Sequence, residues 1–327
     1  MSTPAPPTAY PPVSVIMPVR NEEHDLADAV GSVLAQDYPG GLEVVLAVGP
    51  SSDRTRAVAD DLAARDPRVV VVDNPSGRTP DGLNAAVAAS RQDVVVRMDG
   101  HGELSPGYVR RAVELLEETG AANVGGLMLA EGTGELQRAV AVAMRSPLGI
   151  GAARFHVGGD AGPAETVYLG VFRREWLERV GGYDPTFVRA QDWELNHRIR
   201  EAGGTVWFSP ELQVSYRPRS TWRDLVRQFY TTGQWRRQVV RHHPGSVNLR
   251  YLAPPTAVAL VAAGAVGGLA WRPLWALPLG YAAAVTLGGA WIARDQTPGV
   301  VARMPGVLAV MHLTWGAGFL RGPDAPS

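Results

Sequence analysis

The sequence contains no cysteine and no lysine, although it is 327 residues long. Without cysteine the chain cannot form disulfides, thiolate metal sites or a cysteine nucleophile. Without lysine it cannot carry out Schiff-base chemistry or build a Walker-type phosphate loop, because both require that side chain. All 31 basic side chains are therefore arginine, and 32 acidic residues bring the net charge to −1. This balance disfavours a large nucleic-acid footprint, and we expect no nucleic-acid partner.

The first twelve residues are rich in proline, alanine and threonine and lack a basic region followed by an apolar core. They are not typical of a signal peptide, and we expect a disordered lead-in over 1–12. The catalytic part is then expected to stay on the cytoplasmic side, where it is made.

Residues 13–129 alternate short valine-rich runs with stretches whose apolar residues recur every three or four positions. The first pattern predicts strands and the second amphipathic helices, so the region predicts an α/β fold with a mostly parallel sheet. Ser105 and Pro106 are typical of an N-cap and a first helical position, and they predict a helix over Pro106–Thr119. The predicted strands are Val13–Met17, Leu42–Val48, Arg68–Asp73 and Asp93–Met98, and the other predicted helices are Glu23–Gln36, Arg54–Arg65 and Gly82–Arg91.

The fourth predicted strand ends in Asp99, Gly100 and His101. In an open α/β sheet, ligands bind beyond the carboxyl ends of the strands. Asp99 and His101 lie there, and the glycine between them lets backbone and ligand approach closely. A carboxylate and an imidazole so placed can share one divalent cation, Mn²⁺ or Mg²⁺, which suits a diphosphate. A plain Asp-Gly turn is the alternative. The stretch predicts a nucleotide-sugar enzyme.

Polar residues also follow the other predicted strands. The candidates for nucleotide-sugar binding are Pro18, Arg20, Asn21 and Glu22 after the first strand, Asp53 after the second, Asn84 in the third helix, and Asp99. We expect Arg20 near phosphate and Asp53 as acceptor of a hydrogen bond from a base ring N–H, while the open N–H groups of the third helix form an anion site. Helix capping is the alternative for Asn21, Glu22 and Asp53.

Asp192 stands where a helix over Asp192–Ala202 is expected to begin. A general base for sugar transfer must be a carboxylate within hydrogen-bond reach of the acceptor hydroxyl. Glu194 would point to a different face, and we expect it to pair with Arg198 one turn on. An N-cap is the alternative for Asp192, but Leu195 occupies the position where a capping box needs Glu or Gln. We therefore predict that Asp192 is the catalytic base.

Composition changes sharply after Tyr251. Three apolar segments follow, namely Leu252–Ala270, Leu274–Ala293 and Met304–Leu320, and each approaches the roughly 20 residues that cross a bilayer. The third is the weakest candidate, because Pro305 and His312 interrupt it. A helical hairpin buried in a soluble core is the alternative, but the abundant small residues are typical of packed membrane helices. We expect two to three transmembrane helices in a multi-pass plasma-membrane protein.

Arginine is crowded into residues 217–250, just before these segments. By the positive-inside rule this belt faces the cytoplasm, and residues 221–250 are expected to lie along anionic headgroups as an amphipathic segment. A solvated charged helix is the alternative. Gln234, Trp235 and Arg236 combine an aromatic platform with a guanidinium fork, which suits a sugar diphosphate. They are candidates for the acceptor site, and so is His156, for which a structural role is the alternative.

In this order, the motifs resemble inverting glycosyltransferases of family 2 with the GT-A fold. The resemblance is carried by Val13–Glu22, Ser52-Asp53, Asp99-Gly100-His101, Gly181–Asp184 and Gln191-Asp192, and it covers most of residues 13–240. Arg154–Gly159, Val167–Gly170, Tyr216–Ser220 and the apolar C-terminal region look like the membrane-anchored, succinoglycan-type exopolysaccharide glucosyltransferases of that family.

The resemblance implies that Asp53 recognises uracil, that Asp99 and His101 form the metal motif, and that Asp192 is the base. His101 replaces the usual second Asp, which leaves the preferred ion open. Gln191 replaces a common Glu, which removes a charge that would raise the pKa of the base. The Gln-x-x-Arg-Trp signature of processive synthases is not intact around Gln234, which disfavours a polymerase.

We expect transfer of a sugar, glucose first, from a UDP-sugar to a polyprenyl-diphosphate-linked acceptor in exopolysaccharide or cell-envelope glycan synthesis. Other glycan-synthesis membrane proteins are further candidate partners. The alternatives are a polyprenyl-phosphate sugar synthase, a catalytically silent glycan- or nucleotide-binding subunit of a synthesis complex and, more remotely, a soluble nucleotidyltransferase. The expected layout is a lead over 1–12, a GT-A domain over 13–220, an interfacial segment over 221–250, a membrane region over 251–320 and a tail over 321–327.

Overall fold

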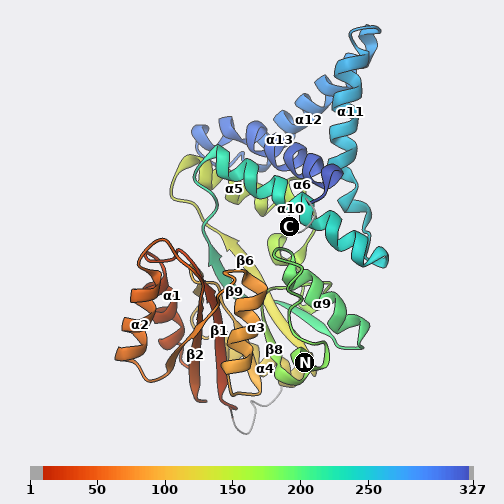
Figure 1. Cartoon of the computed structure of the whole chain (residues 1–327). Coiled ribbons are helices and arrows are strands. Elements are labelled where there is room, and N and C mark those ends of the chain that lie inside the picture. Colours follow the sequence, from red (N-terminus) through yellow and green to blue (C-terminus); the bar gives the residue numbers. More distant parts are fainter. Residues whose placement is uncertain (1–9, 324–327) are drawn as a thin grey trace. The chain divides into compact units, whose positions relative to one another are not determined.

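A computed structural model describes residues 10–323 of the chain (Figure 1). The chain divides into two compact units, the first formed by Met1–Leu129 with Gly158–Tyr216 and the second by Ala130–Val157 with Arg217–Ser327. Residues 1–9 of the expected lead and residues 324–327 of the expected tail lie outside the described residues. Tyr10 is held in place, because its hydroxyl donates to Glu114 Oε1 at 2.8 Å.

The first unit is an α/β structure, as predicted, and its strands form one mixed sheet. The described strands are β1 (Val13–Val19), β2 (Leu42–Val48), β3 (Val69–Asp73), β4 (Val94–Arg97), β5 (Glu103–Leu104), β6 (Asn123–Ala130), β7 (Gly162–Pro163), β8 (Tyr168–Arg173) and β9 (Val206–Tyr216). Their order is β3-β2-β1-β4-β8-β6-β9-β5, with β7 beside β9. The first four strands of this order are parallel to one another, whereas β8 runs antiparallel to β4 and β6.

The parallel half of the sheet positions the candidate site. Its central strands are buried almost throughout, since the side chains of Val15, Ile16 and Val96 are fully inaccessible. Burial on both faces explains why these strands appear in the sequence as continuous apolar runs rather than alternating ones. The helix α3 (Thr79–Ala89) packs on β1, β2 and β3 and covers one face of this half (Figure 1).

The other helices of the first unit are α1 (Leu26–Leu34), α2 (Thr55–Arg65), α4 (Tyr108–Thr119), α8 (Arg174–Arg179) and α9 (Gln191–Glu201). Helices α1, α2, α4 and α9 follow the predicted pattern with shifted ends. The helix predicted from Pro106 begins at Tyr108, because Gly107 adopts a left-handed φ of 74° and cannot belong to the helix. The strands β6 and β9 were not predicted.

The second unit is helical. Its elements are α5 (Glu135–Met144), α6 (Pro147–Ile150), α7 (Arg154–Val157), α10 (Trp222–His242), the short 3-10 turns η1 (Pro244–Ser246) and η2 (Leu249–Tyr251), α11 (Ala253–Gly267), the turn η3 (Arg272–Trp275), α12 (Ala276–Ile292) and α13 (Pro298–Arg321). The sequence predicted a single domain over 13–220. In the structure, residues 130–157 belong instead to the unit of the C-terminal helices.

Two segments of the second unit are long and apolar enough to cross a membrane, namely Arg272–Ile292 and Pro298–Arg321. The ranking expected from the sequence is therefore wrong. The segment expected to be weakest forms the continuous helix α13 despite Pro305, whereas the first apolar segment forms the 15-residue α11. A helix of 15 residues is about 22 Å long, short of the roughly 30 Å hydrocarbon core.

Small residues bring α10 and α13 into backbone contact. A Cβ on Gly233 would lie 2.0 Å from the carbonyl oxygen of Trp315, and one on Gly318 would lie 2.0 Å from that of Tyr230. No larger residue fits at either position without a shift of the backbone. The close approach fixes α10, which carries the arginine-rich segment, against the longest apolar helix.

Candidate active site

The loops after β1 and β2 are hydrogen-bonded to each other at the carboxyl edge of the sheet. The backbone N–H of Ser52 donates to Asn21 Oδ1 at 2.9 Å, and the N–H of Glu22 donates to Thr55 Oγ1 at 2.7 Å. Arg20 joins them, because its Nε donates to the carbonyl oxygen of Pro50 at 3.1 Å. Five of the predicted nucleotide-binding residues, Pro18, Arg20, Asn21, Glu22 and Asp53, thus lie on or beside two linked loops.

Asp53 has internal partners for both carboxylate oxygens. Oδ1 accepts from the hydroxyl and the N–H of Thr55, at 2.5 and 3.0 Å, and Oδ2 accepts from the N–H of Glu23 at 3.2 Å. The hydroxyl bond is the main reason why the pKa of Asp53 is lowered. Asp53 precedes Arg54, the N-cap residue of α2, and its carboxylate links the start of α2 to the loop after β1.

The side chain of Asn84 is hydrogen-bonded to the backbone of Tyr183. Its Oδ1 accepts from the N–H of Tyr183 at 2.8 Å and its Nδ2 donates to the carbonyl of Tyr183 at 2.7 Å. This pair of bonds ties α3 to the loop at Gly181 and Gly182, whose φ values of 77° and 71° end α8. Both polar groups of the Asn84 side chain therefore already have protein partners.

Arg97 is the buried centre of the site. It is the last residue of β4, and 5% of its side chain is exposed. Its guanidinium donates to Asp99 Oδ1 at 2.9 Å and forms an ion pair with Asp192 Oδ1. Burial opposes its charged form, but the carboxylates of Asp192 and Asp99 outweigh this and keep the pKa of Arg97 raised. One buried cation thus connects the predicted base with the predicted metal acid.

Arg97 was not among the predicted site residues, although the sequence contains a signal for it. An arginine within a run of valines must be buried with the strand, and buried charges in proteins are paired. The structure supplies the two carboxylates that this rule requires.

Asp192 is the second residue of α9, so the N-cap alternative is wrong. The residue in the cap position is Ala190, which has a φ of 60°. Asp192 Oδ1 is buried against Arg97, while 28% of the side chain remains accessible to solvent. Burial raises the pKa of Asp192 and the charge of Asp99 adds to this, whereas Arg97 lowers it. A carboxylate anchored through one oxygen and accessible elsewhere is suited to accept a proton from a bound hydroxyl.

Buried hydrogen bonds hold α9 in place. Asn123 of β6 donates to Asn196 Oδ1 at 2.7 Å, and Asn196 Nδ2 donates to Thr166 Oγ1 at 2.9 Å. Arg198 pairs with Glu194 at 2.6 Å, as predicted, and also donates to the carbonyl of Gly182 at 2.8 Å. The helix that carries Asp192 is therefore attached both to the sheet and to the glycine loop.

Backbone strain gathers around the same edge. Among the described residues, three other than glycine have positive φ angles, namely Asn21, Leu169 and Ala190. Asn21 follows β1, Leu169 is the second residue of β8, and Ala190 precedes α9. Such conformations cost about 1–3 kcal/mol each and persist where the surroundings enforce them, typically at functional sites.

Asp99 and His101 follow β4 with accessible side chains, 22% and 41% exposed. Nδ1 of His101 lies 2.9 Å from Glu22 Oε1, so the Nε2 side of the ring is turned away from that carboxylate. Among the described residues no three His, Asp or Glu side chains come together as a metal site. One carboxylate and one imidazole fit a divalent ion whose remaining ligands are phosphate oxygens and water.

The predicted acceptor residues belong to the second unit. Gln234 Nε2 donates to the carbonyl of Gly322 at 2.9 Å, and the Arg236 guanidinium lies 4.5 Å from the ring centre of Tyr251. Arg250 lies 4.9 Å from the same ring. Burial, together with the charge of Arg250, lowers the pKa of His156 to about 3. The structure therefore brings His156 and Arg236 to the surroundings of one arginine–tyrosine cluster, while Trp235 is half-buried on α10.

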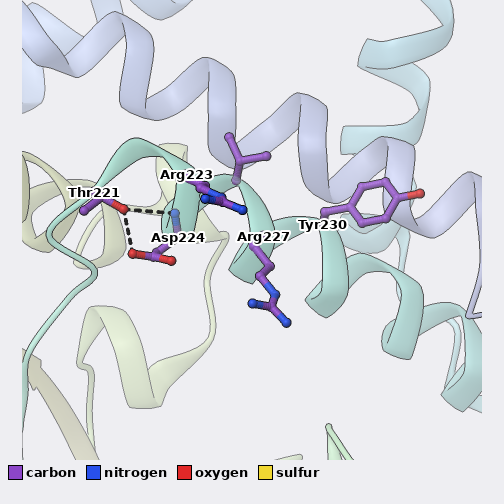
Figure 2. Close-up of a pocket in the computed structure, with 6 residues that line it drawn as sticks. Thr221, Arg223, Asp224, Arg227 and Tyr230 are labelled. Carbon is purple, nitrogen blue, oxygen red and sulfur yellow. Dashed lines mark hydrogen bonds between the residues drawn. The ribbon is translucent and has the colours of Figure 1, made fainter.

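A hollow of about 780 Å³ lies along the first turns of α10 (Figure 2), lined by Thr221, Arg223, Asp224, Val226, Arg227 and Tyr230. Asp224 caps the helix with Thr221, whose hydroxyl donates to Asp224 Oδ2 at 2.6 Å. Within the described part of the chain, the guanidinium groups of Arg223 and Arg227 form no ion pair and no hydrogen bond. The hollow therefore offers two guanidinium groups one helical turn apart, beside the carboxylate of Asp224.

Comparison with known proteins identifies the relatives of this chain. The family profile of Glycosyl transferase family 2 matches residues 14–181. The chain is 33% identical, over 94% of its length and 93% of the relative's, to the succinoglycan biosynthesis protein ExoA of Rhizobium meliloti. It is 22% identical, over 74% of its length and 77% of the relative's, to a dolichyl N-acetyl-α-D-glucosaminyl phosphate 3-β-D-2,3-diacetamido-2,3-dideoxy-β-D-glucuronosyltransferase of Methanococcus voltae.

A solved structure shares the fold. The mannosyltransferase PcManGT of Pyrobaculum calidifontis, determined with GDP-Man and Mn²⁺, superposes with a TM-score of 0.63 at 23% identity. The alignment covers 96% of this chain and 88% of that one. Together with the mostly parallel sheet, this similarity confirms the expected GT-A fold.

Proposed function

The chain belongs to Glycosyl transferase family 2 and is a glycosyltransferase, and from this premise we propose that it transfers a sugar from a UDP-sugar to a lipid-linked acceptor with inversion. The observation that carries the proposal is the buried group in which Arg97 joins Asp192 to Asp99. It places a candidate base and a candidate metal acid at one edge of the sheet. UDP-glucose is the first donor to test.

The reaction is a single displacement. The acceptor hydroxyl gives its proton to Asp192 as its oxygen attacks the anomeric carbon, and the bond from that carbon to the diphosphate oxygen breaks on the opposite face. UDP leaves with the electron pair, so an α-linked donor yields a β-linked product. Arg97 orients Asp192 through Oδ1 and leaves the rest of the carboxylate for the acceptor.

Asp99 and His101 are proposed to hold a divalent cation, Mn²⁺ or Mg²⁺. The ion supplies positive charge that offsets the charge developing on the leaving diphosphate. The loops that carry Arg20, Asn21, Glu22 and Asp53 are proposed to bind the nucleotide, with Asp53 toward the base. The bonds between these loops support this assignment, because they form a prearranged platform at the strand ends.

The acceptor is proposed to be a sugar on a polyprenyl diphosphate. The Methanococcus voltae relative is by name a transferase that acts on a dolichyl-linked sugar phosphate, and the Rhizobium meliloti relative supports a role in exopolysaccharide synthesis. In this chain Arg223 and Arg227 offer guanidinium groups to an anionic headgroup (Figure 2). His156, Gln234, Trp235 and Arg236 remain proposed acceptor residues.

We further propose that the second unit anchors the enzyme in the plasma membrane through more than one pass, with the first unit in the cytoplasm. Large apolar side chains that stay exposed just after α11 and on α12, such as Leu269 and Leu287, support insertion. The arginines of α10 support a cytoplasmic face by the positive-inside rule. Other membrane proteins of glycan synthesis are the proposed partners.

The test is transfer of labelled sugar from a panel of UDP-sugars into the lipid fraction of membranes that contain the wild type or Asp192→Asn. We expect metal-dependent transfer from one donor and a loss of about 10²–10⁴-fold in the variant. No transfer from any donor would contradict the proposal, and equal transfer by the variant would move the base elsewhere. Mass spectrometry of the product separates the acceptors, because one sugar on a monophosphate would indicate a polyprenyl-phosphate sugar synthase.

A further inference from the structure

Glu22 and His101 form a hydrogen-bonded pair between two neighbouring strand ends. Glu22 follows β1 and His101 follows β4, and these strands are parallel neighbours in the sheet. Glu22 Oε1 lies 2.9 Å from His101 Nδ1, and 20% of the Glu22 side chain is exposed. The contact thus joins a loop that is proposed to bind the nucleotide to a residue that is proposed to bind the metal.

The backbone on both sides builds this contact. Gly100 is buried, and a Cβ there would lie 3.0 Å from Val19 Cγ1 and 3.2 Å from Glu22 Cγ. The turn that carries His101 therefore rests directly on the Glu22 side chain. The N–H of Glu22 is fixed by Thr55 Oγ1, and its carbonyl accepts from the N–H of Leu26 at 3.0 Å at the start of α1. Neither partner reaches the other through a long mobile loop.

We infer that Glu22 is a positioning residue for the metal, acting through His101. A neutral imidazole carries its proton on one nitrogen and binds a metal through the other. When the Glu22 carboxylate accepts a hydrogen bond from Nδ1–H, Nε2 is left unprotonated on the side of the ring away from Glu22. Carboxylate partners of this kind fix the tautomer and orientation of metal-binding histidines. The inference rests on the proposed metal dependence.

The pair also explains a departure from the family pattern. An aspartate in place of His101 would offer oxygen atoms that need no choice of tautomer, whereas a histidine requires a partner that makes this choice. Glu22 is the partner that the structure provides. Gly100, expected to let the backbone approach a ligand, instead lets the turn approach Glu22.

The test measures Mn²⁺ binding to the full-length protein in detergent by electron paramagnetic resonance, with and without UDP. Glu22→Met removes the acceptor at similar side-chain length, and Glu23→Met is the matched control. Glu23 carries the same charge one residue along and accepts from the N–H of Arg54 at 3.0 Å. We expect the Kd for Mn²⁺ to rise about 10–100-fold in Glu22→Met and to change about twofold at most in the control.

A second readout follows the imidazole itself. In ¹⁵N-histidine NMR spectra of the metal-free protein, assigned with His101→Ala, we expect His101 to be protonated at Nδ1 in the wild type. Glu22→Met should mix the tautomers, while Glu22→Gln should retain much of the wild-type signal because its amide oxygen still accepts a hydrogen bond. These spectra report on the pair before any metal is added.

Three results would overturn the inference. If His101→Ala abolishes Mn²⁺ binding but Glu22→Met does not weaken it, the metal site stands and the positioning role is wrong. If Glu22→Met weakens UDP binding equally with and without Mn²⁺, Glu22 acts on the nucleotide instead. If the wild type itself binds no Mn²⁺, the proposed metal dependence fails and this inference fails with it, an outcome that the wild-type measurement alone reveals.

Discussion

The two compact units place their apolar and charged side chains in opposite ways. In the first unit the large apolar side chains are buried around the sheet, and the charged groups of the site gather beyond the strand ends. In the second, Leu269 and Leu287 are 81% and 73% exposed. Extended apolar surface of this kind is rare on proteins surrounded by water. The contrast is consistent with the proposal that the second unit inserts into a membrane.

The largest expected effect comes from removing the buried cation of the first unit. Arg97→Met would leave Asp99 and Asp192 facing each other without compensation, which we expect to lower the free energy of unfolding by about 3–5 kcal/mol. Thermal unfolding of the purified protein measures this. Arg56→Met is the control, because its ion pairs with Asp60 and Asp73 are exposed and should contribute less than about 1 kcal/mol.

If Arg97→Met does not fold, Arg97→Lys keeps the measurement possible, since it retains the charge and loses the two-pronged geometry. If Arg97→Met and Arg56→Met lower the free energy of unfolding equally, the buried group is not the centre of the site.

The next largest effect is expected from a charge placed on the exposed apolar surface of the second unit. Leu287→Arg places a charge on the exposed face of α12, and we expect a penalty of about 2.5–3.5 kcal/mol if that face lies at mid-depth in a bilayer. The readout is the fraction of protein that alkaline carbonate extracts from membranes, which should increase. Val70→Arg in the first unit, where Val70 is 37% exposed, should leave extraction unchanged. Identical extraction of both variants would argue against insertion of α12.

Acid should affect the second unit through His156. Burial lowers its pKa from 6.5 to about 3, so the unfolded state binds the proton more readily than the folded one. This histidine therefore contributes stability above pH 6.5, and that contribution declines as the pH falls toward 3, by at most about 1.4 kcal/mol per pH unit. The melting temperature of the wild type minus that of His156→Gln should decrease from pH 7 to pH 4. A constant difference would contradict the buried neutral state.

The smallest effect concerns Ala190, which holds a left-handed conformation before α9. Ala190→Gly relieves this conformation, and we expect a gain in stability of up to about 1 kcal/mol. The same change loosens the start of the helix that carries Asp192, so kcat should fall a few-fold while the stability rises. A fall in both quantities would show that the Ala190 side chain contributes packing instead.

The parallel half of the sheet and its polar edge could be predicted because each feature is local. Valine runs predict β1, β2 and β4, and the polar residues follow directly in sequence. Strands β6 and β9 escaped prediction since β6 contains Gly125 and Gly126 and β9 contains Pro210, residues that are depleted in strands.

The candidate site was predictable in its members but not in its connections. Asp99 and Asp192 are 93 positions apart in the sequence, and their link through Arg97 depends on where α9 packs on the sheet. Asn84 was expected to bind a ligand because the predicted third helix began nearby, at Gly82, whereas in the structure its side chain bonds the backbone of Tyr183 from within α3. Contacts between distant segments decide such roles, and a single sequence does not record them.

The shared arginine also constrains the order of events in a catalytic cycle. Arg97 supplies one positive charge against the two negative charges of Asp99 and Asp192, so these three side chains together disfavour a diphosphate beside them. The divalent cation proposed at Asp99 would offset this negative charge. On that proposal we expect the ion to enter with or before the nucleotide and the acceptor to arrive last, so that free nucleotide without the ion acts as a weak inhibitor.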